Sequence, residues 1–230
     1  MAFLRGRITQ IERPEETFLV SLLLEKKPHY LPGQYFKLRL PQREDLISAT
    51  VFPVAGNEAH LQVMTPGQMQ GLQGEEIQLF GAFGNGFTLP KHKSRIGVYV
   101  PAGTSAISML PFLDLALSAA HEVTLLTDSF ISGLLAEVEV LPLSHSREVF
   151  KWADRLVCAA TFADAQQVAK EILPLRPRIS KPLEDEMLVL SENPCSGLAA
   201  CQLCALQTRS GWKHACKDGP VFRLAELGGV

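Results

Sequence analysis

Four of the five cysteines lie close together near the end of the 230-residue chain, within 22 positions. The fifth, Cys158, stands alone in an apolar stretch and is most simply a small buried hydrophobic residue. In a reducing cytosol, clustered cysteines indicate metal or redox chemistry more often than disulfides, because thiol-reducing systems keep disulfides open. The four residues, called the tail cysteines below, are Cys195, Cys201, Cys204 and Cys216.

The spacing of the tail cysteines is close to that of a plant-type [2Fe–2S] site. A two-iron cluster needs four thiolates, and plant-type proteins take three of them from a C-x4-C-x2-C loop and the fourth from a more distant segment. Here the gaps are x5, x2 and x11, so the first gap is one residue longer. Small side chains let backbone amides point at the sulfurs. The loop supplies them, and we expect one [2Fe–2S] cluster bound by all four tail cysteines; the small residues are Ser196, Gly197, Ala199 and Ala200.

A structural zinc site is the alternative for the same residues. Such sites usually carry two C-x2-C pairs, and this tail has one, Cys201 and Cys204. The spacing therefore favours iron–sulfur over zinc, and a zinc-stabilised scaffold stays open as the weaker alternative.

The first 92 residues have the pattern of an antiparallel β-barrel. Short apolar or alternating runs are typical of strands, and turn signals such as Pro32-Gly33 and Gly84-Asn85-Gly86 separate them. The intervals between these signals suit antiparallel strands in a small barrel. Strands are predicted over residues 18–24, 35–40 and 60–64.

From residue 93 to residue 178, strands alternate with helical stretches, which predicts a parallel α/β sheet. Two prolines, Pro174 and Pro177, then end the helical pattern. The remaining segment, 179–230, begins with one more strand and carries the tail cysteines. Strands are predicted over 95–100, 122–127, 155–160 and 187–190, and helical stretches up to Leu117 and over 162–173.

The composition is that of a soluble globular protein, with 47% hydrophobic and 20% charged residues. A net charge of -2 gives no general attraction to nucleic acid or to an anionic membrane. The longest apolar runs fall short of the roughly 20 residues that span a bilayer, and the N-terminus lacks the apolar region of a secretion signal. We therefore expect a cytoplasmic protein with no nucleic-acid partner and no membrane span.

The tail cysteines, together with the closing sequence Cys216-Lys217-Asp218-Gly219-Pro220-Val221-Phe222, resemble the electron-transfer subunit of class 1B dihydroorotate dehydrogenase. The likeness extends to the segments 31–36 and 81–87. It implies a ferredoxin-reductase-like flavin barrel over 1–92, a nucleotide-binding α/β domain over 93–178 and a [2Fe–2S] subdomain over 179–230. The same ending occurs in flavin subunits of sulfhydrogenases and of NADH-dependent ferredoxin:NADP oxidoreductase.

The resemblance also implies a role. In that family the chain is a non-catalytic subunit of an oxidoreductase of pyrimidine biosynthesis. It relays electrons from the FMN of a catalytic flavoprotein subunit through [2Fe–2S] to FAD and NAD⁺, within a hetero-oligomer. We expect a similar relay here, with a catalytic flavoprotein subunit or another redox partner.

The flavin motifs of that family are altered in this chain. An Arg-Pro-x-Ser segment contacts FAD there, and the matching stretch here is Ser48-Ala49-Thr50-Val51. The replacements remove a fixed cation suited to phosphate. A second element, Gly-x-Gly-Thr, is not recognisable in residues 65–69. FAD stays open as a cofactor although these changes argue against it, and a flavin-free [2Fe–2S] relay or docking module in another redox complex is the alternative.

The family's nucleotide-binding glycine turn is reduced to residues 102–108, in which Gly103 is the one glycine. Glycines there allow the backbone to approach a pyrophosphate, so NAD(P) is not expected. Gly103 and Thr104 are the candidate cofactor-binding residues, because amides and hydroxyls at a helix N-terminus attract anions. The favoured alternative is that Thr104 or Ser105 caps the helix. No catalytic residue is predicted.

Overall fold

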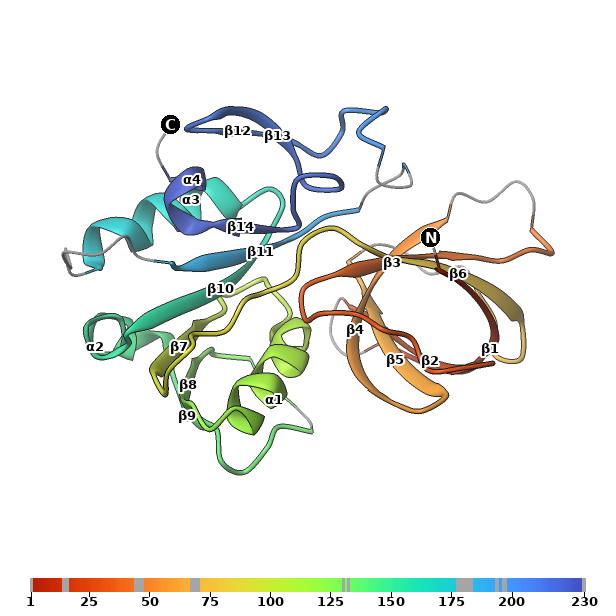
Figure 1. Cartoon of the computed structure of the whole chain (residues 1–230), viewed down its shortest axis with the longest axis horizontal. Helices are drawn as coiled ribbons and strands as arrows, with labels where there is room; N and C mark the ends of the chain where they lie inside the picture. Colours follow the sequence, from red (N-terminus) through yellow and green to blue (C-terminus); the bar gives the residue numbers. More distant parts are fainter. Residues whose placement is uncertain are drawn as a thin grey trace.

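The computed structural model describes residues 2–13, 17–43, 48–66, 71–129, 131, 133–176, 184–192, 195 and 198–228. Within these ranges the chain forms a closed six-stranded barrel and a six-stranded sheet that lie side by side, with a two-stranded hairpin near the C-terminus (Figure 1). The barrel and the sheet are the architecture that the sequence predicts, whereas the hairpin was not predicted.

The barrel consists of the first six strands in the order β1-β2-β5-β4-β3-β6, and all neighbouring pairs are antiparallel. Alternation along β2 turns Val20, Leu22 and Leu24 into the barrel core. The predicted strands agree with β2, β3 and β5 to within one residue. The strands are β1 (Ala2–Glu12), β2 (Phe18–Leu24), β3 (Tyr35–Arg39), β4 (Ala49–Asn57), β5 (His60–Thr65) and β6 (Glu76–Phe83).

The second sheet has the order β14-β11-β10-β7-β8-β9. Its pairs are parallel except for β14, which runs antiparallel to β11. The central strand β10 is buried along nearly its whole length, as expected of a parallel strand covered on both faces. The strands are β7 (Arg95–Tyr99), β8 (Glu122–Leu126), β9 (Glu139–Leu141), β10 (Arg155–Thr161), β11 (Glu186–Leu190) and β14 (Val221–Arg223).

Short helices cover this sheet. Helix α1 contacts both β8 of the sheet and β4 of the barrel, so it bridges the two bodies, while α2 contacts β7 and α3 contacts β10. Among the described residues, no helix is long and apolar enough to cross a membrane. The helical segments are η1 (Ala106–Met109), α1 (Leu110–Ser118), η2 (Leu143–His145), α2 (Ser146–Trp152), α3 (Ala165–Ile172), η3 (Leu173–Leu175) and α4 (Leu224–Leu227).

The C-terminal segment, 179–230, contributes two strands to the sheet. Strands β11 and β14 both belong to it, and the chain between them forms a loop and the hairpin of β12 (Ala205–Thr208) and β13 (Gly211–His214). The end of the segment packs on the barrel, since the Asn85 amide donates to the Gly219 carbonyl oxygen at 2.6 Å. A Cβ at Gly84 would lie 2.4 Å from that oxygen, so this close approach requires glycine.

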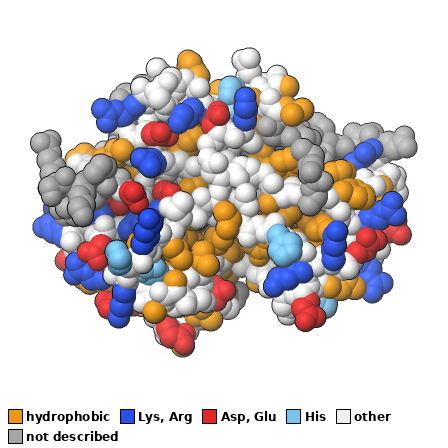
Figure 2. Space-filling model, viewed as in Figure 1, with side chains coloured by type: hydrophobic (Ala, Val, Ile, Leu, Met, Phe, Trp, Pro, Cys, Tyr) orange, Lys and Arg blue, Asp and Glu red, His pale blue; other side chains and the backbone are white. Residues whose placement is uncertain are grey.

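Charges of both signs are interspersed on the face shown in Figure 2, with hydrophobic side chains over its middle. This distribution fits the net charge of -2, and the described residues form no strongly basic patch on that face that would attract nucleic acid.

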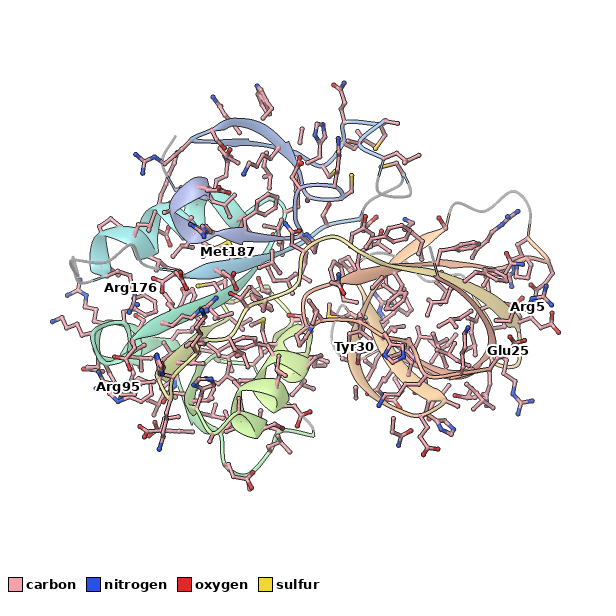
Figure 3. The ribbon with its side chains drawn as sticks, viewed as in Figure 1. Arg5, Glu25, Tyr30, Arg95, Arg176 and Met187 are labelled. Atoms are coloured by element: carbon pink, nitrogen blue, oxygen red, sulfur yellow. The ribbon has the colours of Figure 1, made fainter. Side chains whose placement is uncertain are left out.

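A buried ion pair ties the sheet to its surrounding loops. Arg176 Nε donates to Asp185 Oδ2 at 2.8 Å, with side-chain exposures of 0% and 3% (Figure 3). The same guanidinium donates to the carbonyl oxygens of Phe150 and Ala153. Asp185 Oδ1 in turn accepts from the Leu156 amide at 2.7 Å. One arginine therefore joins η3, the end of α2 and the starts of β10 and β11.

We expect Arg176→Met to lower the free energy of unfolding by about 3–5 kcal/mol, because it leaves the Asp185 carboxylate buried without its cation. The matched control is Lys93→Met, whose ion pair with Glu122 is exposed and should cost under about 1 kcal/mol. Urea denaturation of both variants measures the difference. Equal, small losses would contradict the stabilising role of the buried pair.

Candidate iron–sulfur site

Two of the tail cysteines are buried and two are half-buried. Cys204 and Cys216 belong to the core shared by the sheet and the barrel wall, whereas Cys195 and Cys201 are more open to solvent.

The β12–β13 hairpin explains how Cys204 and Cys216 come together although eleven residues separate them in the sequence. Ala205 pairs with His214, and the next amide outward, that of Ala215, donates to the Cys204 carbonyl at 2.9 Å. The hairpin thus brings Cys204 and Cys216 together.

The sulfurs of Cys195 and Cys216 lie 3.6 Å apart. A disulfide bond would be about 2.05 Å long, so these are two separate thiols. Two sulfurs on one tetrahedral metal, with metal–sulfur bonds of about 2.3 Å, lie roughly 3.8 Å apart along the tetrahedron edge. The pair therefore has the spacing of two ligands on one metal, and thiolates are the ligands that iron–sulfur clusters use.

Backbone amides also point at these sulfurs. The Cys216 amide donates a hydrogen bond to Cys204 Sγ at 3.4 Å, and the Ala199 amide donates a hydrogen bond to the Cys216 sulfur. Ala199 and Gln202 both adopt φ near +57°, a left-handed conformation that is uncommon outside glycine. Amide hydrogen bonds of this kind stabilise thiolates and influence cluster potentials.

Cys201 is not drawn into this group. Within the described ranges its sulfur makes no hydrogen bond to another tail cysteine, and no three Cys, His, Asp or Glu side chains lie together as a ready single-ion site. In residue type and number, the tail cysteines fit a thiolate-bound cluster.

Protonation opposes metal binding at the buried end of the site. Burial raises the pKa of the Cys216 thiol to about 12, and its contact with Cys204 adds to the rise, while the Ala199 amide acts in the opposite direction. Cys216 is therefore a neutral thiol at neutral pH in the metal-free protein. A metal must displace this proton, which makes metal affinity depend on pH.

The barrel wall contacts the site through Tyr35 on β3. Its hydroxyl donates to the Cys216 carbonyl oxygen at 2.7 Å, and its ring packs against Phe52 on β4 with centroids 6.0 Å apart. Burial, and then the charge of Cys216, raises the pKa of the Tyr35 phenol, so it stays a hydrogen-bond donor. Tyr35 was not among the predicted site residues.

A second unpredicted residue on the same face is Lys37. It is 1% exposed, and its Nζ donates to Thr50 Oγ1 at 3.0 Å. Burial lowers the pKa of Lys37 to about 8, and the charges of three tail cysteines oppose that fall. Strand alternation could have revealed it, because residues 35 and 37 of one strand share a face. The three cysteines, in order of effect, are Cys195, Cys216 and Cys201.

In the stretch that matches the family's flavin motif, the side chains of neighbouring residues point to opposite faces of β4. Thr50 faces Lys37, whereas Val51 is fully buried in the barrel core and Ser48 is half-buried before β4. Val51 therefore faces the barrel interior. Residues 67–69 of the second flavin element lie outside the described residues.

The candidate nucleotide turn precedes η1. Gly103 has φ +80°, and a Cβ there would meet no atom within 4 Å. The Thr104 hydroxyl is buried and has no hydrogen-bond partner among the described residues. Ser105 occupies the N-cap position, yet its side chain makes no capping bond. The capping role predicted for Thr104 or Ser105 is therefore wrong, because the helix begins as a 3₁₀ turn in which the Ser105 carbonyl accepts from Ser108 Oγ.

A cleft of about 630 Å³ lies between the barrel and α1, which is within the size range of small-molecule sites. Its barrel side includes Tyr30 (Figure 3), and burial raises the pKa of the Tyr30 phenol, with Asp114 on α1 adding to the rise. The tail cysteines do not line this cleft, so it is a feature separate from them.

Residues 196–228 match the family described as the iron-sulfur cluster binding domain of dihydroorotate dehydrogenase B. The whole chain is also 24% identical to the electron transfer subunit of dihydroorotate dehydrogenase B (NAD⁺) from Clostridium perfringens, over 99% of this chain and 98% of that one. The chain is a homologue of these electron transfer subunits. The corresponding subunit of Clostridium acetobutylicum is 22% identical, over 85% of each chain. The resemblance predicted from the tail sequence is confirmed.

Solved structures show the same fold. A chain of the NADH-dependent reduced ferredoxin-NADP oxidoreductase superposes with a TM-score of 0.73 at 16% identity, over 96% of this chain and 89% of that one. The ferredoxin reductase of carbazole 1,9a-dioxygenase gives 0.62 at 12% identity, over 77% and 67%. The predicted ferredoxin-reductase-like fold class is confirmed.

We expect Tyr35→Phe to destabilise the protein by about 1–3 kcal/mol, because the buried Cys216 carbonyl loses its donor. The control is Tyr30→Phe, since the described residues offer the Tyr30 hydroxyl no hydrogen bond and its ring contact with Phe36 is kept. Urea unfolding of the two variants tests this. A loss for Tyr35→Phe no larger than for the control would show that the bond carries no net stability.

The five cysteines should differ in their rate of alkylation in the native, metal-free protein. The thiolate is the form that reacts, so at pH 8 iodoacetamide should label Cys216 slowly because of its raised pKa. Cys158 should be labelled most slowly, since complete burial raises its pKa and blocks access. The half-buried Cys195 and Cys201 should react before both of these. Mass spectrometry of timed digests measures the order, and similar rates for all cysteines in denaturant provide the control.

Proposed function

We propose that this chain is an iron–sulfur electron-transfer subunit that holds one [2Fe–2S] cluster through the four tail cysteines. The observation that carries the proposal is the 3.6 Å spacing of the Cys195 and Cys216 sulfurs, of which Cys216 belongs to the iron–sulfur domain match over residues 196–228 and Cys195 directly precedes it. When bound, the cluster would exchange single electrons with other carriers. The protein's own part is to hold the thiolates, direct amides at the sulfurs and limit solvent.

The partner in this proposal is a flavoenzyme, such as a catalytic subunit of the dihydroorotate dehydrogenase type, within a hetero-oligomer. Leu198 and Leu203 support a docking face at the cysteine loop, because both flank Cys201 and are exposed, at 72% and 69%. By analogy with the relatives, the chain would serve pyrimidine biosynthesis in the cytoplasm as an accessory, non-catalytic subunit of an oxidoreductase.

The three proposed parts of the chain have different roles. Residues 179–230 would carry the cluster, while residues 1–92 and 93–178 correspond to the flavin barrel and the nucleotide domain of the relatives. Gly103 and Thr104 would be the groups to meet a nucleotide phosphate, and the partnerless Thr104 hydroxyl favours a polar ligand there.

A flavin-free relay module is the second candidate. Two observations at the flavin stretch favour it. The Val51 side chain faces the barrel core, and the Thr50 hydroxyl accepts a hydrogen bond from Lys37. Acid treatment of the purified protein, which releases bound flavin, separates the two candidates. A subunit of the relatives' type with bound FAD would release it into the supernatant, whereas the flavin-free module would release no flavin.

Single replacement of each tail cysteine by serine should lower bound iron and sulfide from about two of each per chain and reduce the visible absorption of anaerobically purified protein. Cys158→Ala is the matched control and should keep the full content, because Cys158 lies buried in β10. Metal and sulfide analysis gives the answer. A colourless protein with stoichiometric zinc would overturn the redox function in favour of a zinc-stabilised scaffold.

A further inference from the structure

The outer face of β3 contacts the cysteine segment, residues 195–216, through the hydrogen bond from Tyr35 to Cys216, while β4 is contacted from outside the barrel by η1 and α1. Tyr35 and Phe52, from this face, belong to the same hydrophobic cluster as Cys204 and Cys216. Phe36 and Val51, from the opposite face, belong to the separate barrel core. The outer face of β3 and β4 is thus enclosed by this large cluster, which includes two of the tail cysteines.

Lys37 occupies that enclosed position. It lies directly opposite Thr50 in the β3–β4 ladder and donates to its hydroxyl at 3.0 Å. Two residues before it on the same face, Tyr35 holds the Cys216 carbonyl at 2.7 Å. Lys37 is therefore buried on the face of β3 that contacts the cysteine segment, with its amine held by Thr50.

A buried ammonium needs nearby negative charge or strong hydrogen bonding, because removing a cation from water is costly. The charges that act on Lys37 include those of three tail cysteines. The Tyr35 phenol on the same face stays neutral because burial raises its pKa. The cysteine sulfurs become negatively charged when they bind a metal, and their charges act on this lysine.

We propose that Lys37 is a fixed cation that raises the reduction potential of the cluster held by the tail cysteines. The inference rests on the proposed iron–sulfur function and adds a residue outside the ligand set to it. A thiolate-ligated cluster is anionic and gains one further negative charge on reduction, with no bond formed or broken. A cation in a low-dielectric enclosure stabilises the reduced state more than the oxidised state.

The test is a redox titration of the purified holoprotein with dithionite as the electron donor, followed by visible absorption and electron paramagnetic resonance. Lys37→Met and Lys37→Gln remove the charge, and the glutamine also keeps a donor for Thr50. We expect each to lower the ratio of reduced to oxidised cluster at a fixed potential at least tenfold, which equals about 59 mV for a one-electron couple. Lys37→Arg keeps the charge and should shift the ratio much less.

Lys93→Met is the control, because Lys93 is an exposed lysine on the sheet paired with Glu122, and it should leave the potential unchanged. Iron and sulfide are measured before each titration. Full iron content with an unchanged potential in both neutral variants would overturn the role of Lys37 while the proposed function stands. Wild-type protein without iron and sulfide would overturn the proposed function, and the inference with it.

Discussion

The contact between β3 and the cysteine segment is the constraint on which the candidate site depends. The hydrogen bond from Tyr35 to Cys216 joins residues 181 positions apart. The cysteine segment contains one short hairpin and is too small to bury a core of its own. It shares the core of the sheet and the barrel wall, and Cys204 and Cys216 are buried there. The positions of the sulfurs are therefore set by elements from both ends of the chain.

Burial at this contact has opposite consequences for acids and bases. It raises the pKa of Cys216 and lowers that of Lys37, since each neutral form is favoured away from water. A bound metal would reverse the first effect by replacing the thiol proton, and the resulting negative charge would favour the charged lysine. The metal-free site and the loaded site therefore differ in the charge of the cysteines, although the same residues build them.

The barrel and the sheet have the fold of ferredoxin reductases, but a shared fold does not imply a shared site. At the flavin stretch, Val51 faces the barrel core and Thr50 binds Lys37. At the nucleotide turn, Gly103 keeps its positive φ and Thr104 keeps a buried hydroxyl. Residues 196–228, which contain three of the tail cysteines, match a described binding domain.

Much of the architecture follows from local sequence. The two-residue alternation of the barrel strands and the apolar runs of the sheet predict seven strands to within a residue or two: β2, β3, β5, β7, β8, β10 and β11. This is possible because burial of one or both faces of a strand determines the pattern of apolar residues along it. The grouping of the tail cysteines is equally local. What sequence could not decide is which surfaces meet: the entry of β14 into the sheet, the bond from Tyr35 to Cys216 and the enclosure of Lys37 all join distant segments. Lys37 has the composition of a surface residue and is buried, since its surroundings come from β4 and from a segment more than 150 residues later, and only the tertiary structure brings these together.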